Sequence, residues 1–280
     1  MIASFPVASW LTAPPNPILH YIHTQLLNRT FTTGPANLPL YQPNAFDMAL
    51  LIPYFTVLAI LAFYGFHRYS LVFLYYRHRK RRTLEPAQRF ADTPAGLPYV
   101  TVQLPIYNEQ FVVERLVESI CKLDYPRDRL EIQLLDDSTD ETQAVAEAAV
   151  ARAAAAGHPI VYLHRTNRHG YKAGALDEGM RQAKGEFIAI FDADFVPPAD
   201  FLRRTIDYFT DPGLGMVQTR WGYINRDYSW LTQVEAILLD GHFIMEHGAR
   251  HRANLFFNFN GTAGVWRRRA IEDAGGWEHD

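Results

Sequence analysis

The sequence predicts an α/β domain with a mostly parallel sheet, preceded by one transmembrane helix. The first observation is a repeated alternation of short strand-like and helix-like segments that begins near Tyr99. The second is a charge-free apolar stretch from Met48 to Phe66. The third is that the polar clusters "YNE", "DDSTD" and "DAD" each follow a predicted strand. Alternating strands and helices are typical of α/β domains, which bind ligands outside the carboxyl ends of their strands.

Composition limits the classes of protein to which this chain can belong. It has 280 residues, of which 48% are hydrophobic, so it can bury a large core and we expect it to fold. The net charge of −3 gives no overall positive field, so no nucleic-acid partner is predicted. Cys121 is the only cysteine, which excludes an intrachain disulfide and a cysteine-rich zinc site.

Three segments precede the predicted domain. Residues 1–47 are rich in Pro, Asn and Thr and form an irregular leader. Residues 48–76 form a transmembrane helix, because 19 charge-free residues at about 1.5 Å each nearly span a hydrocarbon core of about 30 Å. A buried core helix is the alternative. Residues 77–98 form a basic linker whose "RHRKRR" run places the domain on the cytoplasmic side of an inner, plasma or Golgi-type membrane.

Residues 99–280 form the predicted α/β domain, in which helices follow strands. The expected strands are 99–105, 130–137, 160–164 and 186–191. The first helix carries apolar residues on one face at helical spacing, namely Val112, Val113, Leu116, Val117 and Ile120. A capping box of Ser138 and Glu141 opens the second helix, which ends at Gly157. The third helix spans 172–184 and ends with Gly185 as its cap.

Asp192 and Asp194 are the candidate metal ligands. Charged side chains are rarely buried unless they are paired or bind a metal, and these two follow an apolar strand. Two carboxylates at this spacing can share Mg²⁺ with diphosphate oxygens. A solvated turn is the alternative, but the place at a strand end favours the metal. A second metal site at His242, His247 and His251 is not expected, because no acidic pattern accompanies them.

The other two polar clusters are candidate nucleotide contacts. Asp137 can accept a hydrogen bond from a base N–H, with Tyr107 offering a stacking face and Glu109 a second polar contact. For Asp136, solvation at the end of the strand is the alternative. A calcium loop is excluded, because "DDSTD" lacks the glycine at the sixth position and the terminal bidentate glutamate.

A basic loop, "RTNRHGYKAGAL", completes the candidate site. Arg165, Arg168 and Lys172 lie just ahead of a predicted helix start, where Gly170 and Gly174 allow close approach of the backbone. This is a suitable environment for phosphate, although the loop lacks the spacing of a P-loop. A solvated basic turn is the alternative, and the combination with "DAD" favours phosphate.

Taken in order, the motifs resemble the inverting family 2 glycosyltransferases, and among them the membrane-bound cellulose-synthase-like enzymes. The resemblance covers Val100 to Trp277. It rests on "QLPIYNE", "LDDSTDET", "NRHGYKAGAL", "AIFDADFVP", "VQTRW" and "FNFNGTAGVWRRRAIEDAGGW". The residues of "LDDSTD", "GYKAGAL" and "FNGTAGVWR" look closest to those of the glucomannan mannosyltransferase and xyloglucan glucan synthase branch.

This resemblance implies a Rossmann-like GT-A fold, a nucleotide-sugar donor such as UDP-glucose or GDP-mannose, and Mg²⁺ or Mn²⁺. It implies that the metal ligands are Asp192 and Asp194. The implied nucleotide-sugar contacts are Tyr107, Glu109, Asp137, Lys172 and Asp192. The implied acceptor-side residues are Gln218, Trp221, Asn260, Gly261 and Thr262.

The implied function is a membrane-anchored hexosyltransferase that extends a β-linked polysaccharide with inversion. A non-processive transferase to a lipid acceptor and a catalytically silent nucleotide-sugar-binding fragment are the alternatives. The family continues into a Glu-Asp motif that holds the general base, and then into a Gln-x-x-Arg-Trp motif. The chain stops at Asp280 before both, so neither Glu278 nor Asp280 is assigned as the base. We therefore expect a partial synthase, since loss of a general base costs about two to four orders of magnitude in rate.

Overall fold

The structure is a computed structural model that describes residues 31–33, 39–41, 45–81, 85–92 and 96–278. The chain divides into two units, Met1–Ser70 and Leu71–Asp280. Most of the predicted leader, the linker residues 82–84 and 93–95, and Asp280 lie outside the described residues. Within the leader, β1 (Phe31–Thr33) and β2 (Pro39–Tyr41) pair antiparallel, although the sequence predicts no strand there.

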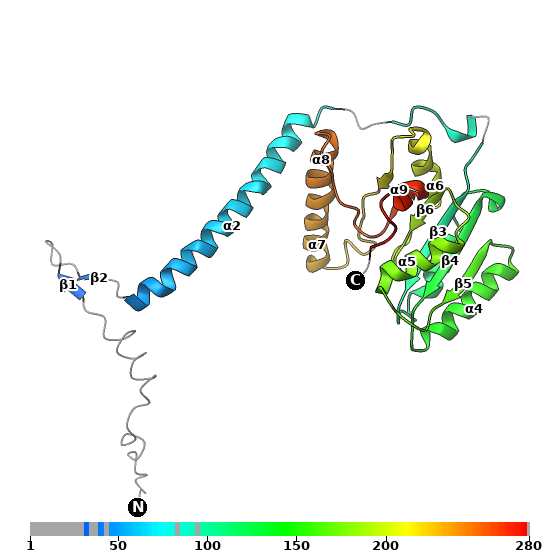
Figure 1. Ribbon diagram of the computed structural model, residues 1–280, viewed down its shortest axis with the longest axis horizontal. Helices are drawn as coiled ribbons and strands as arrows, with labels where there is room; N and C mark the ends of the chain where they lie inside the picture. The colour runs from blue at the N-terminus through cyan, green and yellow to red at the C-terminus, as the bar shows by residue number, and fades with distance from the viewer. Residues whose placement is uncertain (1–30, 34–38, 42–44, 82–84, 93–95, 279–280) are drawn as a thin grey trace, which may run out of the picture. The chain divides into compact units, whose positions relative to one another are not determined.

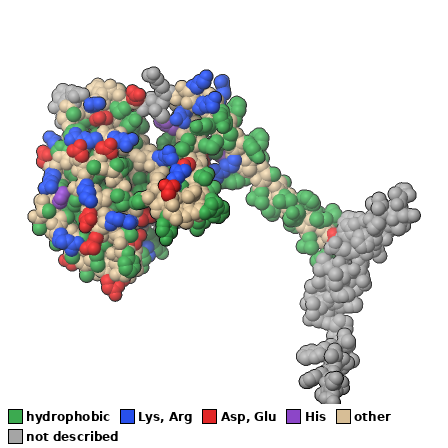
Figure 2. All heavy atoms as spheres, turned by 180° about the vertical axis from the view of Figure 1, so that it is seen from behind, with side chains coloured by type: hydrophobic (Ala, Val, Ile, Leu, Met, Phe, Trp, Pro, Cys, Tyr) green, Lys and Arg blue, Asp and Glu red, His purple; other side chains and the backbone are tan. Residues whose placement is uncertain are grey.

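Helix α2 (Ala45–His78) contains the predicted transmembrane segment and extends beyond it at both ends. Its 34 residues reach about 50 Å at 1.5 Å per residue, more than the thickness of a hydrocarbon core. Only 6% of its most apolar stretch is buried in the structure. Figure 2 shows hydrophobic side chains along most of its surface. By length and composition, α2 is able to cross a membrane.

A six-stranded mixed sheet forms the centre of the second unit (Figure 1). Its strands are, in chain order, β3 (Val100–Ile106), β4 (Leu130–Asp136), β5 (Ile160–His164), β6 (Phe187–Ile190), β7 (Met216–Gln218) and β8 (Gly264–Arg267). They are arranged in the order β5-β4-β3-β6-β8-β7. The first four run parallel, and β8 runs antiparallel to both of its neighbours. The predicted α/β class, with a mostly parallel sheet, is confirmed.

Helices cover both faces of this sheet. The α-helices are α3 (Val113–Ile120), α4 (Thr142–Ala155), α5 (Tyr171–Gln182), α6 (Phe201–Thr205), α7 (Trp230–Asp240), α8 (Gly248–Arg252) and α9 (Arg268–Asp273). Short 3₁₀ segments η1 (Phe90–Asp92), η2 (Arg127–Arg129) and η3 (Ile206–Thr210) and a π-helical segment η4 (Gly241–His247) connect them. Apolar residues of α3, α4 and α6 pack on one face of the sheet, and those of α5 and α9 pack on the other.

Every residue of β3 and β4 is buried, although polar residues alternate with apolar ones along both strands. The polar residues among them pair across the strands under α5. The Thr101 hydroxyl donates to Glu131 at 2.8 Å, and the Gln103 amide donates to Gln133 at 3.0 Å. These pairs compensate for part of the cost of burying polar groups.

Two details of the predicted helix ends are wrong. The side chain of Ser138 does not cap α4, which begins at Thr142; its hydroxyl instead accepts a hydrogen bond from the backbone N–H of Asn108 at 2.8 Å. Gly185 does not cap α5, because that helix ends at Gln182 and the next residue is already extended. The backbone N–H of Gly185 instead donates to Thr101 at 2.8 Å, where the chain passes close to β3.

Replacement of Gly185 by alanine should destabilise the domain. An added Cβ would lie 2.3 Å from the backbone nitrogen of Thr101 and 2.7 Å from the carbonyl oxygen of Phe187, and neither atom can rotate away. We expect a loss of about 1–3 kcal/mol, the range typical of overpacking, measured from the shift of the urea unfolding midpoint. Gly222→Ala is the matched control, since its Cβ would meet nothing within 4 Å. Equal midpoints for the two variants would contradict this explanation.

Candidate functional site

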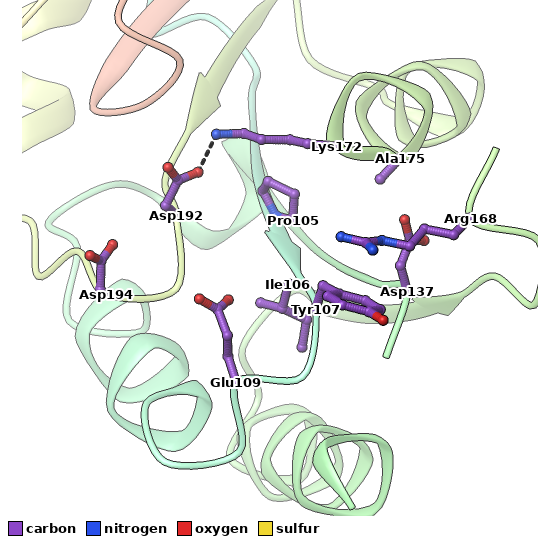
Figure 3. A pocket seen from close by; sticks show the side chains of 10 residues that line it. All are labelled: Pro105, Ile106, Tyr107, Glu109, Asp137, Arg168, Lys172, Ala175, Asp192 and Asp194. Carbon is purple, nitrogen blue, oxygen red and sulfur yellow. Dashed lines mark hydrogen bonds and ion pairs between the residues drawn. The ribbon is translucent and has the colours of Figure 1, made fainter. Parts of the chain in front are cut away.

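A pocket of about 370 Å³ lies at the carboxyl ends of the central parallel strands (Figure 3). This volume is in the range of small-molecule sites, which span about 300–1,000 Å³. Its lining residues come from the end of β3, from the loops after β3, β4, β5 and β6, and from the first half of α5. They are Pro105, Ile106, Tyr107, Glu109, Asp137, Arg168, Lys172, Ala175, Asp192 and Asp194. All six residues predicted to bind the nucleotide sugar or the metal therefore meet in one place.

The pocket has two chemically different ends, which Figure 3 separates. Glu109, Asp192 and Asp194 form what we call the acidic end. Tyr107 and Arg168 form what we call the aromatic end. A ligand that carries an aromatic group and a metal-bound anionic group would therefore match both ends of the pocket.

Asn108 holds the loop between the two ends in place, and it was not predicted as a site residue. It has a left-handed backbone conformation with φ of 54°, which asparagine tolerates better than most residues. Its backbone N–H donates to Ser138, and its side-chain oxygen accepts from the backbone N–H of Thr139 at 2.9 Å. These reciprocal bonds join the loops after β3 and β4, so that Tyr107 and Glu109 point into the pocket. In the sequence, only the place of Asn108 within "YNE" indicated this role.

Asp137 forms a bidentate ion pair with Arg165. The Nε atom of Arg165 donates to Oδ1 at 2.8 Å, and Nη2 donates to Oδ2 at 2.5 Å. The carboxylate of Asp137 is only 4% exposed, so this pair neutralises a nearly buried charge. Arg165 also donates to the carbonyl oxygens of His169 and Tyr171. Arg165 therefore orients Asp137 and the basic loop, and it does not line the pocket as a free phosphate contact.

Arg168 covers the aromatic ring of the site. Its guanidinium carbon lies 3.3 Å from the centre of the Tyr107 ring, a close cation–π contact. The loop that carries Arg168 turns sharply at Gly170, whose φ of 69° is left-handed, and α5 then begins at Tyr171. A planar ligand group that stacked on this face of Tyr107 would displace Arg168 and leave its positive charge beside the ligand.

Lys172 joins the acidic end to the rest of the site. Its ammonium donates to the carboxylate of Asp192 (Figure 3). It also donates to the carbonyl oxygen of Gly261 at 2.9 Å. Burial raises the pKa of Asp192, Lys172 opposes this rise, and the nearby charge of Asp194 adds to it. Burial also raises the pKa of Glu109, with further contributions from Asp194 and Asp192. The acidic end therefore has an excess of negative charge that favours binding a cation.

A divalent metal fits this donor set only together with a ligand. Among the described residues, no group of three or more His, Cys, Asp or Glu side chains is arranged to hold a metal ion. Asp192 and Asp194 provide two hard carboxylates beside an open pocket, and Mg²⁺ is commonly held by one or two carboxylates plus substrate phosphates. The geometry thus matches a metal that is completed by a phosphorylated ligand.

The predicted acceptor-side residues gather around one turn, Asn260–Ala263, next to Asp192. The hydroxyl of Thr262 accepts a hydrogen bond from the backbone N–H of Asp192 at 2.8 Å. Gln218 at the end of β7 and Trp221 both donate to the carbonyl oxygen of Thr262. Asn260 accepts a hydrogen bond from Asn258 and has His242 at 3.3 Å. The structure therefore joins these residues to the carboxylate site, through backbone contacts that no sequence motif shows.

Comparisons with known proteins show the family of this chain. Residues 101–275 match the family model described as glycosyl transferase family 2. Glucomannan 4-beta-mannosyltransferase 9 of Arabidopsis thaliana is 43% identical over 208 residues, which cover 69% of this chain and 39% of that protein. Glucomannan 4-beta-mannosyltransferase 1 of Cyamopsis tetragonoloba is 42% identical over 209 residues, which cover 71% of this chain and 40% of that protein. The chain thus spans about two fifths of these curated relatives.

A solved structure shares the fold. The mannosyltransferase from Pyrobaculum calidifontis, in complex with GDP-Man and Mn²⁺, has a TM-score of 0.55 and 28% sequence identity to this chain. The match covers 78% of this chain and 58% of that one. The predicted GT-A fold of the second unit is confirmed by this similarity.

Replacement of Arg165 by methionine should destabilise the domain strongly, because it leaves the carboxylate of Asp137 nearly buried and unpaired. Breaking a buried ion pair in this way costs about 3–5 kcal/mol, to be measured by urea unfolding. Arg152→Met is the matched control, because Arg152 and Glu114 form an exposed pair worth about 1 kcal/mol or less. The double variant Arg165→Met with Asp137→Asn should recover part of the loss. Equal effects of Arg165→Met and Arg152→Met would contradict a buried pair.

Proposed function

Because the chain belongs to glycosyl transferase family 2, we propose that its pocket binds a nucleotide-sugar donor for transfer of a hexose, with inversion, to a growing β-linked polysaccharide. The observation that carries this proposal is the arrangement of Tyr107, Lys172, Asp192 and Asp194 around one pocket. An aromatic face at one end suits a nucleobase. Two carboxylates and an ammonium at the other suit a diphosphate with its metal.

The chain's own residues would orient the donor. Tyr107 would stack against the base, while Arg168 would move off the ring toward the diphosphate. The amino-terminal end of α5 and Lys172 would contact phosphate oxygens, since a helix amino terminus favours anions. Asp192 and Asp194 would hold Mg²⁺ or Mn²⁺, which when bound neutralises the charge that develops on the leaving diphosphate. We assign no general base among the described residues.

GDP-mannose is our preferred donor, ahead of UDP-glucose. The similar Pyrobaculum calidifontis enzyme is described as a mannosyltransferase in complex with GDP-Man and Mn²⁺, and the curated relatives are glucomannan mannosyltransferases. Calorimetric titration of the full chain with GDP and UDP, each with Mn²⁺, tests this preference; tighter binding of UDP would reverse it.

The place of action that we propose is a membrane, with α2 as the anchor and the pocket on the cytoplasmic side. The support is the length and apolar composition of α2 and the run of Lys and Arg that follows it. Transfer to a lipid acceptor, and donor binding without catalysis, remain the competing functions. A donor screen with linkage analysis of the product, using β-linked oligosaccharide and lipid acceptors in parallel, separates all three.

Asp194→Asn should weaken metal-dependent binding of the diphosphate while it leaves the fold intact. Asp194 is the better choice than Asp192, because replacement of Asp192 would also release Lys172. We expect the affinity for GDP in the presence of Mn²⁺ to fall at least about tenfold, which corresponds to about 1.4 kcal/mol, as measured by calorimetry. Asp200→Asn is the control, because Asp200 is exposed and lies directly before α6. Unaltered, metal-independent binding in Asp194→Asn would refute the metal assignment.

Tyr107→Ala should weaken nucleotide binding by about tenfold, because stacking of a base on an aromatic side chain contributes about 1–3 kcal/mol. Tyr107→Phe keeps the ring and should bind GDP nearly as well as the unaltered protein. Both variants are compared by the same calorimetric titration. If the phenylalanine variant lost as much affinity as the alanine variant, the tyrosine hydroxyl, rather than stacking, would account for the contact.

A further inference from the structure

The Asn260–Ala263 turn has an unusual backbone and therefore depends on contacts from outside itself. Gly261 and Ala263 both adopt left-handed conformations, with φ of 85° and 52°. Glycine takes this conformation readily, but alanine does so at a steric cost. The turn is held in place on one side by β6, because the backbone N–H of Ala263 donates to the carbonyl oxygen of Ile190 at 2.8 Å.

Gln218 holds the opposite side of this turn. Its Nε2 atom lies 3.0 Å from the carbonyl oxygen of Thr262 and 3.2 Å from that of Ala263, and it also reaches that of Thr219 at 3.1 Å. Its Oε1 atom accepts a hydrogen bond from the backbone N–H of Asn260 at 2.9 Å. Both ends of the carboxamide are thus engaged by backbone groups. Its partners in the turn are 42 to 45 residues distant from Gln218 in the sequence.

The same turn contacts the two charged groups at the acidic end of the pocket. The hydroxyl of Thr262, which is 1% exposed, accepts the backbone N–H of Asp192. The carbonyl oxygen of Gly261 accepts from the ammonium of Lys172, which also donates to the carboxylate of Asp192. A displacement of the turn would therefore move the backbone at Asp192 and one of the two acceptors of Lys172.

We propose that Gln218 is a positioning residue for the donor diphosphate: by holding the Asn260–Ala263 turn, it fixes Asp192 and Lys172 at the place where the metal and the phosphates bind. This inference rests on the proposed function. Its physical basis is that charged groups act on a ligand only when they are held within about 0.5 Å of the productive geometry. Gln218 acts through Thr262 and Gly261, and it does not itself contact the ligand.

Gln218→Met tests this role, because methionine keeps the length of the side chain but neither donates to the carbonyl oxygens nor accepts from Asn260. The full chain in detergent micelles or nanodiscs is titrated with GDP or UDP, whichever the unaltered protein binds more tightly, in the presence of Mn²⁺. We expect the affinity for the diphosphate to fall about tenfold. Binding of the corresponding monophosphate without metal reports on the aromatic end alone, and we expect it to change less than about twofold.

Thr262→Val provides the second arm, because it removes the hydroxyl that accepts from Asp192 and keeps the branched shape. If Gln218 acts through Thr262, the double variant should bind the diphosphate no more weakly than the weaker single variant, since coupled positions are not additive. Gln233→Met is the matched control, because Gln233 is exposed on α7 and its replacement makes the same chemical change outside the network. We expect this control to bind both nucleotides like the unaltered protein.

Each outcome supports or overturns one specific statement. If the unaltered protein binds neither GDP nor UDP with Mn²⁺, the proposed function is wrong. If it binds one of them and Gln218→Met binds equally well, Gln218 has no positioning role. A parallel loss of monophosphate and diphosphate binding would show a general loosening of the domain and would overturn the inference. Additive effects in the double variant would show that Gln218 does not act through Thr262, and would overturn it as well.

Discussion

The contact of the Lys172 ammonium with the Asp192 carboxylate and the Gly261 carbonyl oxygen is the interaction on which the geometry of the pocket depends. Its members come from the first turn of α5, the end of β6 and the turn before β8, and they are separated by 20 and 89 residues in the sequence. An ammonium has three donors and can join several acceptors at once. The lysine therefore fastens three segments of the chain at one point, beside the carboxylates that would receive a metal.

The distribution of charge at this point favours a cation. Glu109, Asp192 and Asp194 face the same end of the pocket, and the pKa values of Glu109 and Asp192 are raised by burial and by their acidic neighbours. Carboxylates held close together are stabilised by positive charge that they share. Lys172 supplies one unit of it, and a divalent ion held between the carboxylates and a diphosphate would supply two more. At the aromatic end, Arg168 supplies a positive charge that suits an anionic group of a ligand.

Much of the fold was predictable because each parallel strand presents apolar residues to the core at alternate positions. All four predicted strands are present as β3, β4, β5 and β6 within one residue at either end. The polar clusters after them meet at one edge of the sheet, as parallel topology requires. The errors concern local ends. Ser138 resembles a helix cap in sequence but bonds to Asn108, and Gly185 resembles a helix stop but serves a close approach to β3.

The sequence by itself determined the α/β class, the apolar helix at 48–76, and the polar residues that line the pocket, because each of these follows from local pattern and from the order of strand ends. Only the tertiary structure decided how those residues are held. The pairing of Asp137 with Arg165 and the support of the Asn260–Ala263 turn by Gln218 join segments 28 and 42 residues apart. Spacing in a chain cannot show which polar side chain satisfies a distant backbone group. That choice depends on which segments the packed sheet places side by side, because a hydrogen bond forms only when donor and acceptor atoms lie about 2.9 Å apart.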